Sequence, residues 1–329
     1  MLKVVLVSLL RLLLGGKSGY PEILVLEYGA DKPGDIKNLL EIVKPQIAVV
    51  TAVGDIPVHV EFYSGPEAVA REKAKLIQDL PANGFAILNG DDEAVREMQD
   101  GTRAHVITFG ITQEAEVRVT NFENRMQNGK PAGVSFKISY GGSFVPVHLN
   151  DCFGKTSALA AAAAASLGIV FGMHLVKITE ALLDYEAPNQ RLKLIPGIKG
   201  TYIIDDSYNA SPLSMAAAID TVKSLKASRK VAVLGDMLEL GKYSIEAHES
   251  IGKLAAPVFY LLITVGPRAK FIAESAQRNG LNRKNIFSFA DVDETRIPVQ
   301  DLIRKGDLIL IKGSHAMHLE RLVKEIRQI

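Results

Sequence analysis

Two fragments of the sequence carry the glycine, lysine and hydroxyl residues that bind nucleotide phosphates in many enzymes. Residues 16–18 (Gly-Lys-Ser) follow an apolar run, and residues 154–156 (Gly-Lys-Thr) precede an alanine-rich stretch. A phosphate loop has the pattern Gly-x4-Gly-Lys-Ser/Thr, in which the first glycine opens the tight loop. Arg11 and Leu149 stand at that position in the two fragments. We therefore predict a turn and a helix start, and no Walker A sequence in this chain.

One acidic residue stands where a metal site could form. Glu27 ends the apolar run 22–27 (EILVLE), which reads as a buried strand. Ligand sites of α/β sheets lie beyond the carboxyl ends of the strands, and Mg²⁺ prefers carboxylate oxygens. A solvated acid at a strand end is the alternative interpretation. A nicotinamide oxidoreductase is disfavoured because no Gly-x-Gly-x-x-Gly follows a predicted strand.

Apolar strands alternate with helices in the first part of the chain, which includes Glu27. This pattern predicts a mostly parallel sheet that is covered on both faces. Predicted strands are 22–27, 46–53, 85–89 and 105–109, and predicted helices are 33–42, 66–80, 94–99, 157–168 and 178–185. Between 115 and 149 the pattern changes to alternating runs joined by Gly and Asn turns, which predicts a small antiparallel insert with strands at 117–121, 134–140 and 144–149.

A proline- and glycine-containing stretch from 188 to 200 separates this part from a second series of strands and helices. We divide the chain into a first domain at 1–187 and a second at 188–329. The second domain is predicted as a Rossmann-like doubly wound unit. Its predicted strands are 201–205, 230–234, 260–265 and 307–311, and its predicted helices are 212–225, 246–254, 268–278 and 319–326. The fold class is therefore α/β.

Composition excludes several classes of protein. The 329 residues fit about two to three domains. Lys and Arg number 38 and Asp and Glu 37, so the charge does not favour a nucleic-acid partner. A single cysteine forms no intramolecular disulfide and suits the reducing cytoplasm. The apolar start at 1–14 is shorter than a membrane span and lacks a cleavage site, so we favour a buried helix or strand over a targeting segment.

Ordered motifs along the chain resemble those of the Mur ligase family. Residues 27–36 (EYGADKPGDI) resemble the family segment E-M-G-A-x-x-x-G-[DE]-I. Residues 50–54 with 59–62 resemble TNIG…HLE, residues 67–73 resemble EGIAxAK, and residues 86–92 resemble AVLNxDD. Further matches are 205–212 (DDSYNASP), 234–241 (LGDMLELG) and 312–317 (KGSHAM). The resemblance extends from about residue 22 to the carboxyl terminus. The motif at 205–212, which we call the hinge motif, and the motif at 234–241 favour the branch of the family that adds a dipeptide.

The resemblance implies an ATP-dependent acid–amino-acid ligase that joins an amino group to a carboxylate through an acyl phosphate. It implies that Glu27 is a Mg²⁺ ligand and that His59 is a ligand of a second Mg²⁺. Lys73 matches the lysine that the family carbamylates, so Lys73 and His59 are the implied catalytic residues. Lys75 is a nearby competitor for the modified lysine. Without the resemblance, these side chains could be ordinary solvated residues.

The resemblance also implies nucleotide and substrate contacts. Arg191 matches an arginine that contacts the ATP phosphates, although Gln190 stands where the family usually has glycine. Asp206 and Asn209 resemble ribose and adenine contacts, with strand-end and helix-capping roles as the alternative. The residues implied to face the dipeptide or the peptidyl substrate are Asp236, Glu239 and Lys312. Three further histidines are interpreted as surface or packing residues: His248, His315 and His318.

The implied substrates are a UDP-N-acetylmuramoyl-peptide and D-alanyl-D-alanine, in peptidoglycan precursor synthesis and hence cell-wall growth. In the family, a UDP-binding domain and the phosphate loop precede the segment that resembles 27–36. We therefore expect an N-terminally truncated ligase that is inactive or nearly inactive alone, with an exposed apolar sheet edge that invites aggregation or a partner. Supply of the missing segment in trans is an alternative that stays open. At Ala52 the usual asparagine is replaced, which removes one polar group near the metal site.

Two other functions remain open at this stage. The chain could be a non-catalytic remnant that binds a nucleotide or a dipeptide. It could also be a sister ligase of the same family that adds another amino acid. An upstream coding segment with a phosphate loop would favour the ligase, and its absence would favour the binding module.

Overall fold

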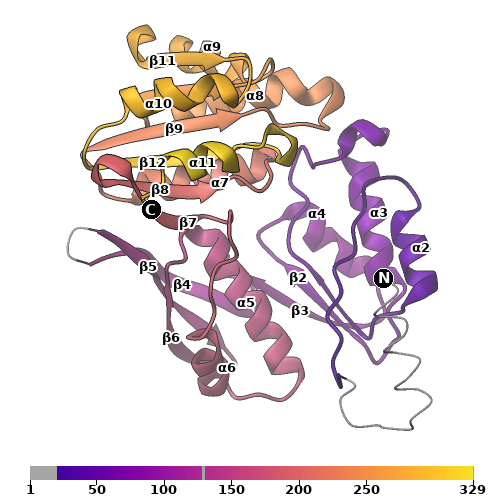
Figure 1. Cartoon of the computed structure of the whole chain (residues 1–329). Helices are drawn as coiled ribbons and strands as arrows, with labels where there is room; N and C mark the ends of the chain where they lie inside the picture. The colour runs from indigo at the N-terminus through magenta and orange to yellow at the C-terminus, as the bar shows by residue number, and fades with distance from the viewer. Residues whose placement is uncertain (1–20, 128–129, 329) are drawn as a thin grey trace, which may run out of the picture.

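Two six-stranded sheets with their helices make up the protein (Figure 1). The structure is a computed structural model, and it describes residues 21–127 and 130–328. The predictions for the apolar start at 1–14 and for the fragment at 16–18 lie outside the described residues.

The first sheet is mixed, with strand order β1-β2-β3-β4-β5-β6. Its strands are β1 (Ile47–Val50), β2 (Phe85–Asn89), β3 (His105–Gly110), β4 (Val117–Gln127), β5 (Lys130–Tyr140) and β6 (Ser143–Asn150). Strands β1 to β4 run parallel, while β4, β5 and β6 pair antiparallel. The predicted antiparallel segment is therefore present, but it extends the parallel sheet instead of forming a separate layer.

Helices cover both faces of this sheet. They are α2 (Asp35–Ile42), α3 (Pro66–Gln78), α4 (Glu93–Arg96), α5 (Gly154–Val170) and α6 (Leu175–Leu182). Alternate residues of β2 serve the two faces: Ile87 packs in the cluster with the alanines of α5, while Ala86 and Leu88 pack with Ile77 of α3. This alternation follows from the two-residue period of a strand. The alanine-rich stretch is therefore core, as predicted.

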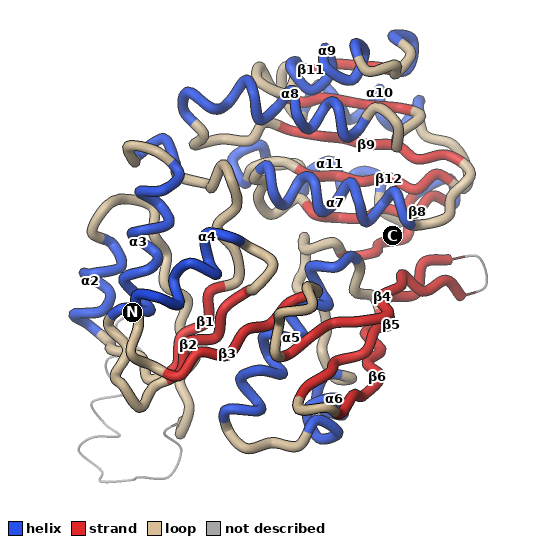
Figure 2. Tube along the Cα trace, turned by 180° about the vertical axis from the view of Figure 1, so that it is seen from behind, coloured by secondary structure: helices blue, strands red, loops and turns tan. Residues whose placement is uncertain are grey.

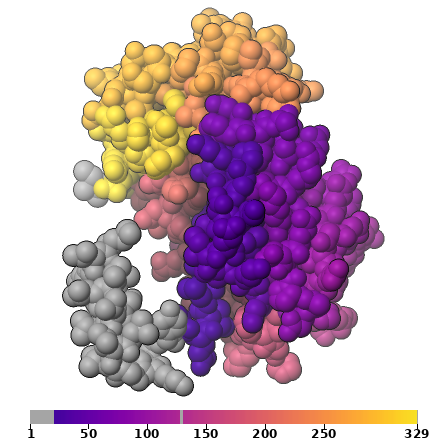
Figure 3. Space-filling view, turned by 90° about the vertical axis from the view of Figure 1, so that its right-hand side faces the viewer, coloured from indigo at the N-terminus to yellow at the C-terminus, as the bar shows by residue number. Residues whose placement is uncertain are grey.

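The prediction of a strand at 22–27 is wrong. This segment forms no strand, and its apolar side chains are exposed, with Val25 at 81%. A run of apolar residues becomes a strand only when a neighbouring strand pairs with its backbone groups. Among the described residues, no strand pairs with 22–27, and β1 is the edge of the sheet. Figure 3 shows this indigo segment on the surface of the molecule.

The second sheet has the order β11-β10-β9-β12-β8-β7 and is parallel except for β7. Its strands are β7 (Lys193–Gly197), β8 (Thr201–Asp206), β9 (Arg229–Gly235), β10 (Leu261–Val265), β11 (Ile286–Phe289) and β12 (Asp307–Lys312). Its helices are α7 (Pro212–Ser224), α8 (Ser244–Ala255), α9 (Lys270–Arg278), α10 (Arg296–Leu302) and α11 (Glu320–Ile326). The α/β prediction is confirmed. Strand β7 lies in the stretch that was interpreted as a junction, and β11 and α10 were not predicted.

The two halves touch through the β4–β5 hairpin and α5, which reach α7 (Figure 2). Asn124 on β4 donates from Nδ2 to Ser224 Oγ at 2.6 Å, and its Oδ1 accepts the backbone N–H of Gly154 at 3.3 Å. A Cβ on Gly154 would come within 2.3 Å of Thr221 Oγ1, so the backbone of α5 lies very close to α7. We call this set of contacts the hairpin contact.

Within the described ranges, no helix is both long and apolar enough to cross a membrane.

Candidate functional site

A cleft of about 1640 Å³ lies between the two halves of the protein. One wall holds the segment 51–59 beyond β1, the cleft-facing side of α3, and Asn89 at the end of β2. The start of α5 also lines the cleft from the first half, and the second half contributes Asn209 and α7. The carboxyl ends of parallel strands meet here, which is where ligands bind in sheets of this kind.

The loop after β1 is held in place by polar side chains that follow β2. Asp92 Oδ2 accepts the backbone N–H groups of Val53 and Gly54 at 2.8 and 2.9 Å, and its Oδ1 accepts that of Val95 at 3.1 Å. Asn89 donates from Nδ2 to the carbonyl of Thr51 at 2.7 Å. The NGDD segment was noted as a motif, but its role as the anchor of this loop was not predicted.

Carboxylates gather around Lys73, which lies on α3 and lines the cleft. Burial lowers the pKa of the Lys73 ammonium, against the opposing effect of Asp31 and Glu27. Burial, together with Glu72, Asp35 and Asp31, also raises the pKa of the neighbouring Tyr63 to about 12. We call the carboxylates of Glu27, Asp31, Asp35 and Glu72, which affect the pKa of Lys73 or Tyr63, the acidic wall. Asp31, which was not singled out from the sequence, belongs to it.

His59 joins this acidic region to the second half of the protein. Its Nε2 lies 3.2 Å from Asp31 Oδ1, and its Nδ1 lies 2.6 Å from Glu239 Oε2 in the loop after β9. His59 and Lys73 both line the cleft, while Glu27 is exposed outside its lining and is close enough to affect the pKa of Lys73. The structure adds Glu239, which reaches His59 from the other side of the cleft.

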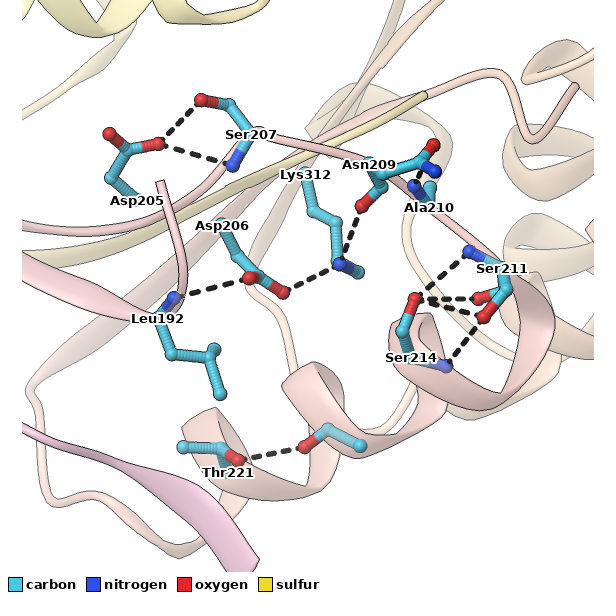
Figure 4. A network of polar contacts seen from close by, with 11 residues as sticks. Leu192, Asp205, Asp206, Ser207, Asn209, Ala210, Ser211, Ser214, Thr221 and Lys312 are labelled. Atoms are coloured by element: carbon cyan, nitrogen blue, oxygen red, sulfur yellow. Dashed lines mark hydrogen bonds and ion pairs between the residues drawn. The ribbon is translucent and has the colours of Figure 1, made fainter. Parts of the chain in front are cut away.

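A buried ion pair occupies the base of the hinge between the halves (Figure 4). Lys312 is 2% exposed, and its Nζ lies 2.6 Å from Asp206 Oδ2 and donates to the carbonyl of Asn209 at 2.9 Å. Asp206 Oδ1 accepts the backbone N–H of Leu192 at 3.1 Å. One pair therefore ties together β12, the β8–α7 loop and the entry to β7.

Arg191 lies beside this ion pair and is exposed. Its guanidinium carbon lies 4.1 Å from the centre of the Tyr208 ring, and the other neighbour of that ring is His315, with the ring centroids 5.5 Å apart. Gln190 adopts a left-handed backbone with φ 63°, and its carbonyl accepts the N–H of Tyr208 at 3.3 Å. Gln190 thus adopts a conformation that glycine adopts more easily.

Two predicted substrate contacts do not face the cleft. Lys312 is enclosed by the hinge network, and Asp236 is 1% exposed. The carboxylate of Asp236 accepts the N–H groups of Arg268 and Ala269 at 3.0 and 2.6 Å. Hydrogen bonds within the protein offset the free-energy cost of burying these two charged groups. Both side chains therefore hold loops together. The sequence shows that a motif contains a carboxylate or an ammonium group, but it does not show which groups from distant parts of the chain enclose it.

His248 is fully buried, as its interpretation as a packing residue allowed. Its Nε2 accepts the N–H of Met237 at 3.0 Å, and its Nδ1 donates to the carbonyl of Ser244 at 2.6 Å. Burial lowers the pKa of this imidazole, so the ring is neutral in this setting. Together with Ser314, whose Oγ accepts the N–H of Leu238 at 2.9 Å, it shapes the loop that carries Glu239.

Comparison with known proteins places both halves in one family. The family description "Mur ligase middle domain" matches residues 7–167, and "Mur ligase, glutamate ligase domain" matches residues 190–315. The chain belongs to the Mur ligase family. A Mur ligase of Bacillus subtilis named UDP-N-acetylmuramoyl-tripeptide–D-alanyl-D-alanine ligase is 31% identical over 307 residues, which are 93% of this chain and 64% of that protein.

Solved structures of Mur ligases share the fold. MurF of Thermotoga maritima, in complex with ADP, superposes with a TM-score of 0.79 at 26% identity and covers 93% of this chain and 68% of its own. MurF of Acinetobacter baumannii gives a TM-score of 0.78 at 25% identity, with 90% and 63% covered. The chain spans less than two thirds of the length of the curated Mur ligases it matches.

Proposed function

We propose that the chain binds ATP with Mg²⁺ in the cleft and serves the ligase reaction for which its relatives are named. That reaction adds D-alanyl-D-alanine to a UDP-N-acetylmuramoyl-tripeptide. A substrate carboxylate takes the terminal phosphoryl group of ATP and forms an acyl phosphate and ADP. The amino group of the dipeptide then attacks the carbonyl carbon, phosphate leaves with the bonding electron pair, and the nitrogen loses a proton.

One observation carries this proposal. The cleft is lined by both halves, so the strand ends and Lys73 of the first half face Asn209 of the second across a single cavity. A reaction with three reactants needs such a site, because holding the reactants together removes much of the entropic cost of their encounter. The likeness to ligases along both halves supports the same conclusion.

The acidic wall fits a magnesium ion that is held mainly by water and phosphate. The described residues contain no group of three His, Cys, Asp or Glu side chains placed to hold a metal. Mg²⁺ usually binds one or two carboxylates and keeps its remaining positions for water and substrate phosphates. We propose that Glu27, Asp31 and His59 supply the protein side of this arrangement. When bound, the ion neutralises charge on the transferring phosphoryl group.

Lys73 is the better candidate for carbamylation. Its lowered pKa leaves more of the amine neutral, and only the neutral amine attacks carbon dioxide. The new N–C bond forms as one C=O π bond of carbon dioxide breaks, and the nitrogen releases a proton to water. Lys75 Nζ is instead engaged in an ion pair with the buried Glu72 at 2.6 Å. A carbamate beside Asp31 and Glu27 adds a negative charge, which a bound cation offsets.

The hinge supplies the proposed nucleotide contacts. Asn209 lines the cleft, with its Oδ1 accepting the N–H of Ala210 at 2.9 Å, while Arg191 keeps its charged donors exposed beside the hinge. Arginine suits phosphate because its donors are fixed in a plane and always charged. Asp206 acts on the nucleotide through the segments that it holds together. We keep the division into a nucleotide-binding domain at 1–187 and a second ligase domain at 188–329.

Calorimetry of the purified chain with MgATP and with MgADP tests the proposal. We expect saturable binding that Glu27→Gln weakens about tenfold, because a carboxylate near the ion is lost. Glu41→Gln is the matched control, since Glu41 is an exposed acid on α2 away from the cleft, and it should bind like the parent. Absence of binding by the folded parent, or equal binding by Glu27→Gln, would contradict the proposed site. The expected inactivity of the chain alone stays a prediction for a ligation assay.

A further inference from the structure

The loops 59–62 and 239–243 meet across the cleft, far from the hairpin contact. The N–H of Glu61 donates to the carbonyl of Glu239 at 3.3 Å. A Cβ on Gly241 would lie 3.3 Å from the Cα of Glu61, so the two backbones approach closely there. This backbone contact brings the side chains of His59 and Glu239 together.

Both of these residues adopt an unfavourable backbone conformation. His59 has φ 68° and Glu239 has φ 62°, in the left-handed region that ordinary side chains avoid. Such conformations persist where the surroundings determine them, and they cluster at functional sites. The loop of Glu239 is held rigidly by His248 and Ser314, which accept the N–H groups of Met237 and Leu238. Glu239 is therefore presented to His59 by a braced loop.

The imidazole of His59 depends on Glu239 for one of its two nitrogens. The Nδ1 atom is buried and makes no aligned hydrogen bond with any group in the described part of the chain. The carboxylate of Glu239 lies 2.6 Å from this nitrogen and is the acceptor in reach. Leaving a buried ring nitrogen unpaired is costly. With Glu239 at Nδ1, the Nε2 atom faces Asp31 and the acidic wall.

We propose that Glu239 is a positioning residue that reaches across the cleft to orient the His59 ring. A histidine that binds a cation through one nitrogen commonly gives its other N–H to a carboxylate, which sets the tautomer. Here that carboxylate comes from the other half of the protein. The orientation of His59 therefore depends on the two halves being closed over the cleft. A role of His59 toward a bound nucleotide and its ion rests on the proposed function. The contact between His59 and Glu239 does not.

Distance measurements test the closing part of the proposal. Cysteines introduced at the exposed Arg96 and Lys253 carry spin labels, while Cys152 is buried. Without any nucleotide, the parent should show one main distance. Glu239→Ala should add a longer distance and raise the open population about fivefold relative to the closed one, the size expected for a partly exposed charged contact. Glu239→Gln keeps an acceptor and should lie between them. Glu246→Gln, an exposed acid on α8, should match the parent.

Nitrogen NMR of the histidine rings tests the orienting part. The chain has seven histidines, and His59→Gln identifies the signal of His59 by its loss. We expect Glu239→Ala to move the His59 ring signals to a different tautomer pattern, and Glu239→Gln to restore them in part. Unchanged His59 signals in both variants would overturn the proposal, and so would an unchanged distance distribution. Neither measurement uses ATP or Mg²⁺, so failure here is separable from failure to bind nucleotide.

Discussion

Removing the charge of Lys312 should destabilise the second half of the protein strongly. Lys312→Met keeps the length of the side chain but leaves the Asp206 carboxylate, 7% exposed, with only the N–H of Leu192 as a partner. Breaking a buried ion pair from one side costs about 3–5 kcal/mol because the remaining charge is uncompensated. Domains are stable by about 5–15 kcal/mol, so this loss removes a large share of the free energy of unfolding.

The magnitude is measurable by urea unfolding with a local reporter. Because the chain has no tryptophan, a Tyr260→Trp background reports the second half alone. Lys305→Met, which changes an exposed lysine, is the control and should cost less than about 0.5 kcal/mol. The double variant Lys312→Met with Asp206→Asn should recover about 1–3 kcal/mol relative to the sum of the single changes. A cost of Lys312→Met below about 1 kcal/mol, or strict additivity, would refute a buried, coupled pair.

Three further predictions concern other parts of the chain. Burial lowers the pKa of His248 below its ordinary 6.5, so the unfolded chain takes up the proton at a higher pH than the folded chain does. The free energy of unfolding should therefore fall as the pH drops through 6.5. His248→Gln should flatten this part of the plot of unfolding free energy against pH. Asp92→Ala leaves three backbone N–H groups without their acceptor and should cost about 1–3 kcal/mol in urea unfolding, against little for Glu93→Ala. Val25→Lys changes a highly exposed residue and should leave stability unchanged while reducing light scattering on heating; a large stability loss would mean that the segment is packed.

Strands with both faces buried were predictable from the sequence. β2, β10 and β12 are apolar runs of five or six residues, and their continuous hydrophobicity matches their position inside the sheets. The edge strands of the first sheet, β1 and β6, were predicted, but those of the second sheet, β7 and β11, were not. β7 contains Pro196 and β11 has a partly exposed face, so neither is a continuous apolar run. The error at 22–27 is the converse, because no strand of the described ranges pairs with this apolar run.

The sequence could predict only those parts of the site in which the motif residues all belong to one half of the protein. His59 lies 3.2 Å from Asp31, and Asp31 and Glu27 both affect the pKa of Lys73; the roles of these side chains stay predictions. The orientation of Lys312 depends on Asp206, which is remote in sequence. The contact of His59 with Glu239 depends on how the two halves meet. No local pattern encodes that arrangement, since it follows from the packing of α5 and the hairpin on α7.

The hairpin contact and the contact of His59 with Glu239 differ in how strongly each resists a rotation of one half against the other. The hairpin contact lies at one side of the cleft, where α5 brings small side chains close to α7, and the contact of His59 with Glu239 closes the other side. If the hairpin contact acts as a fulcrum, a small rotation there becomes a large displacement at the opposite rim. A weak contact far from the axis of rotation, such as that of His59 with Glu239, therefore resists opening of the cleft more effectively than a stronger contact near the axis. The partly buried pair of His59 and Glu239 and the apolar packing of Val60 and Val69 with Leu240 therefore resist opening at the same rim.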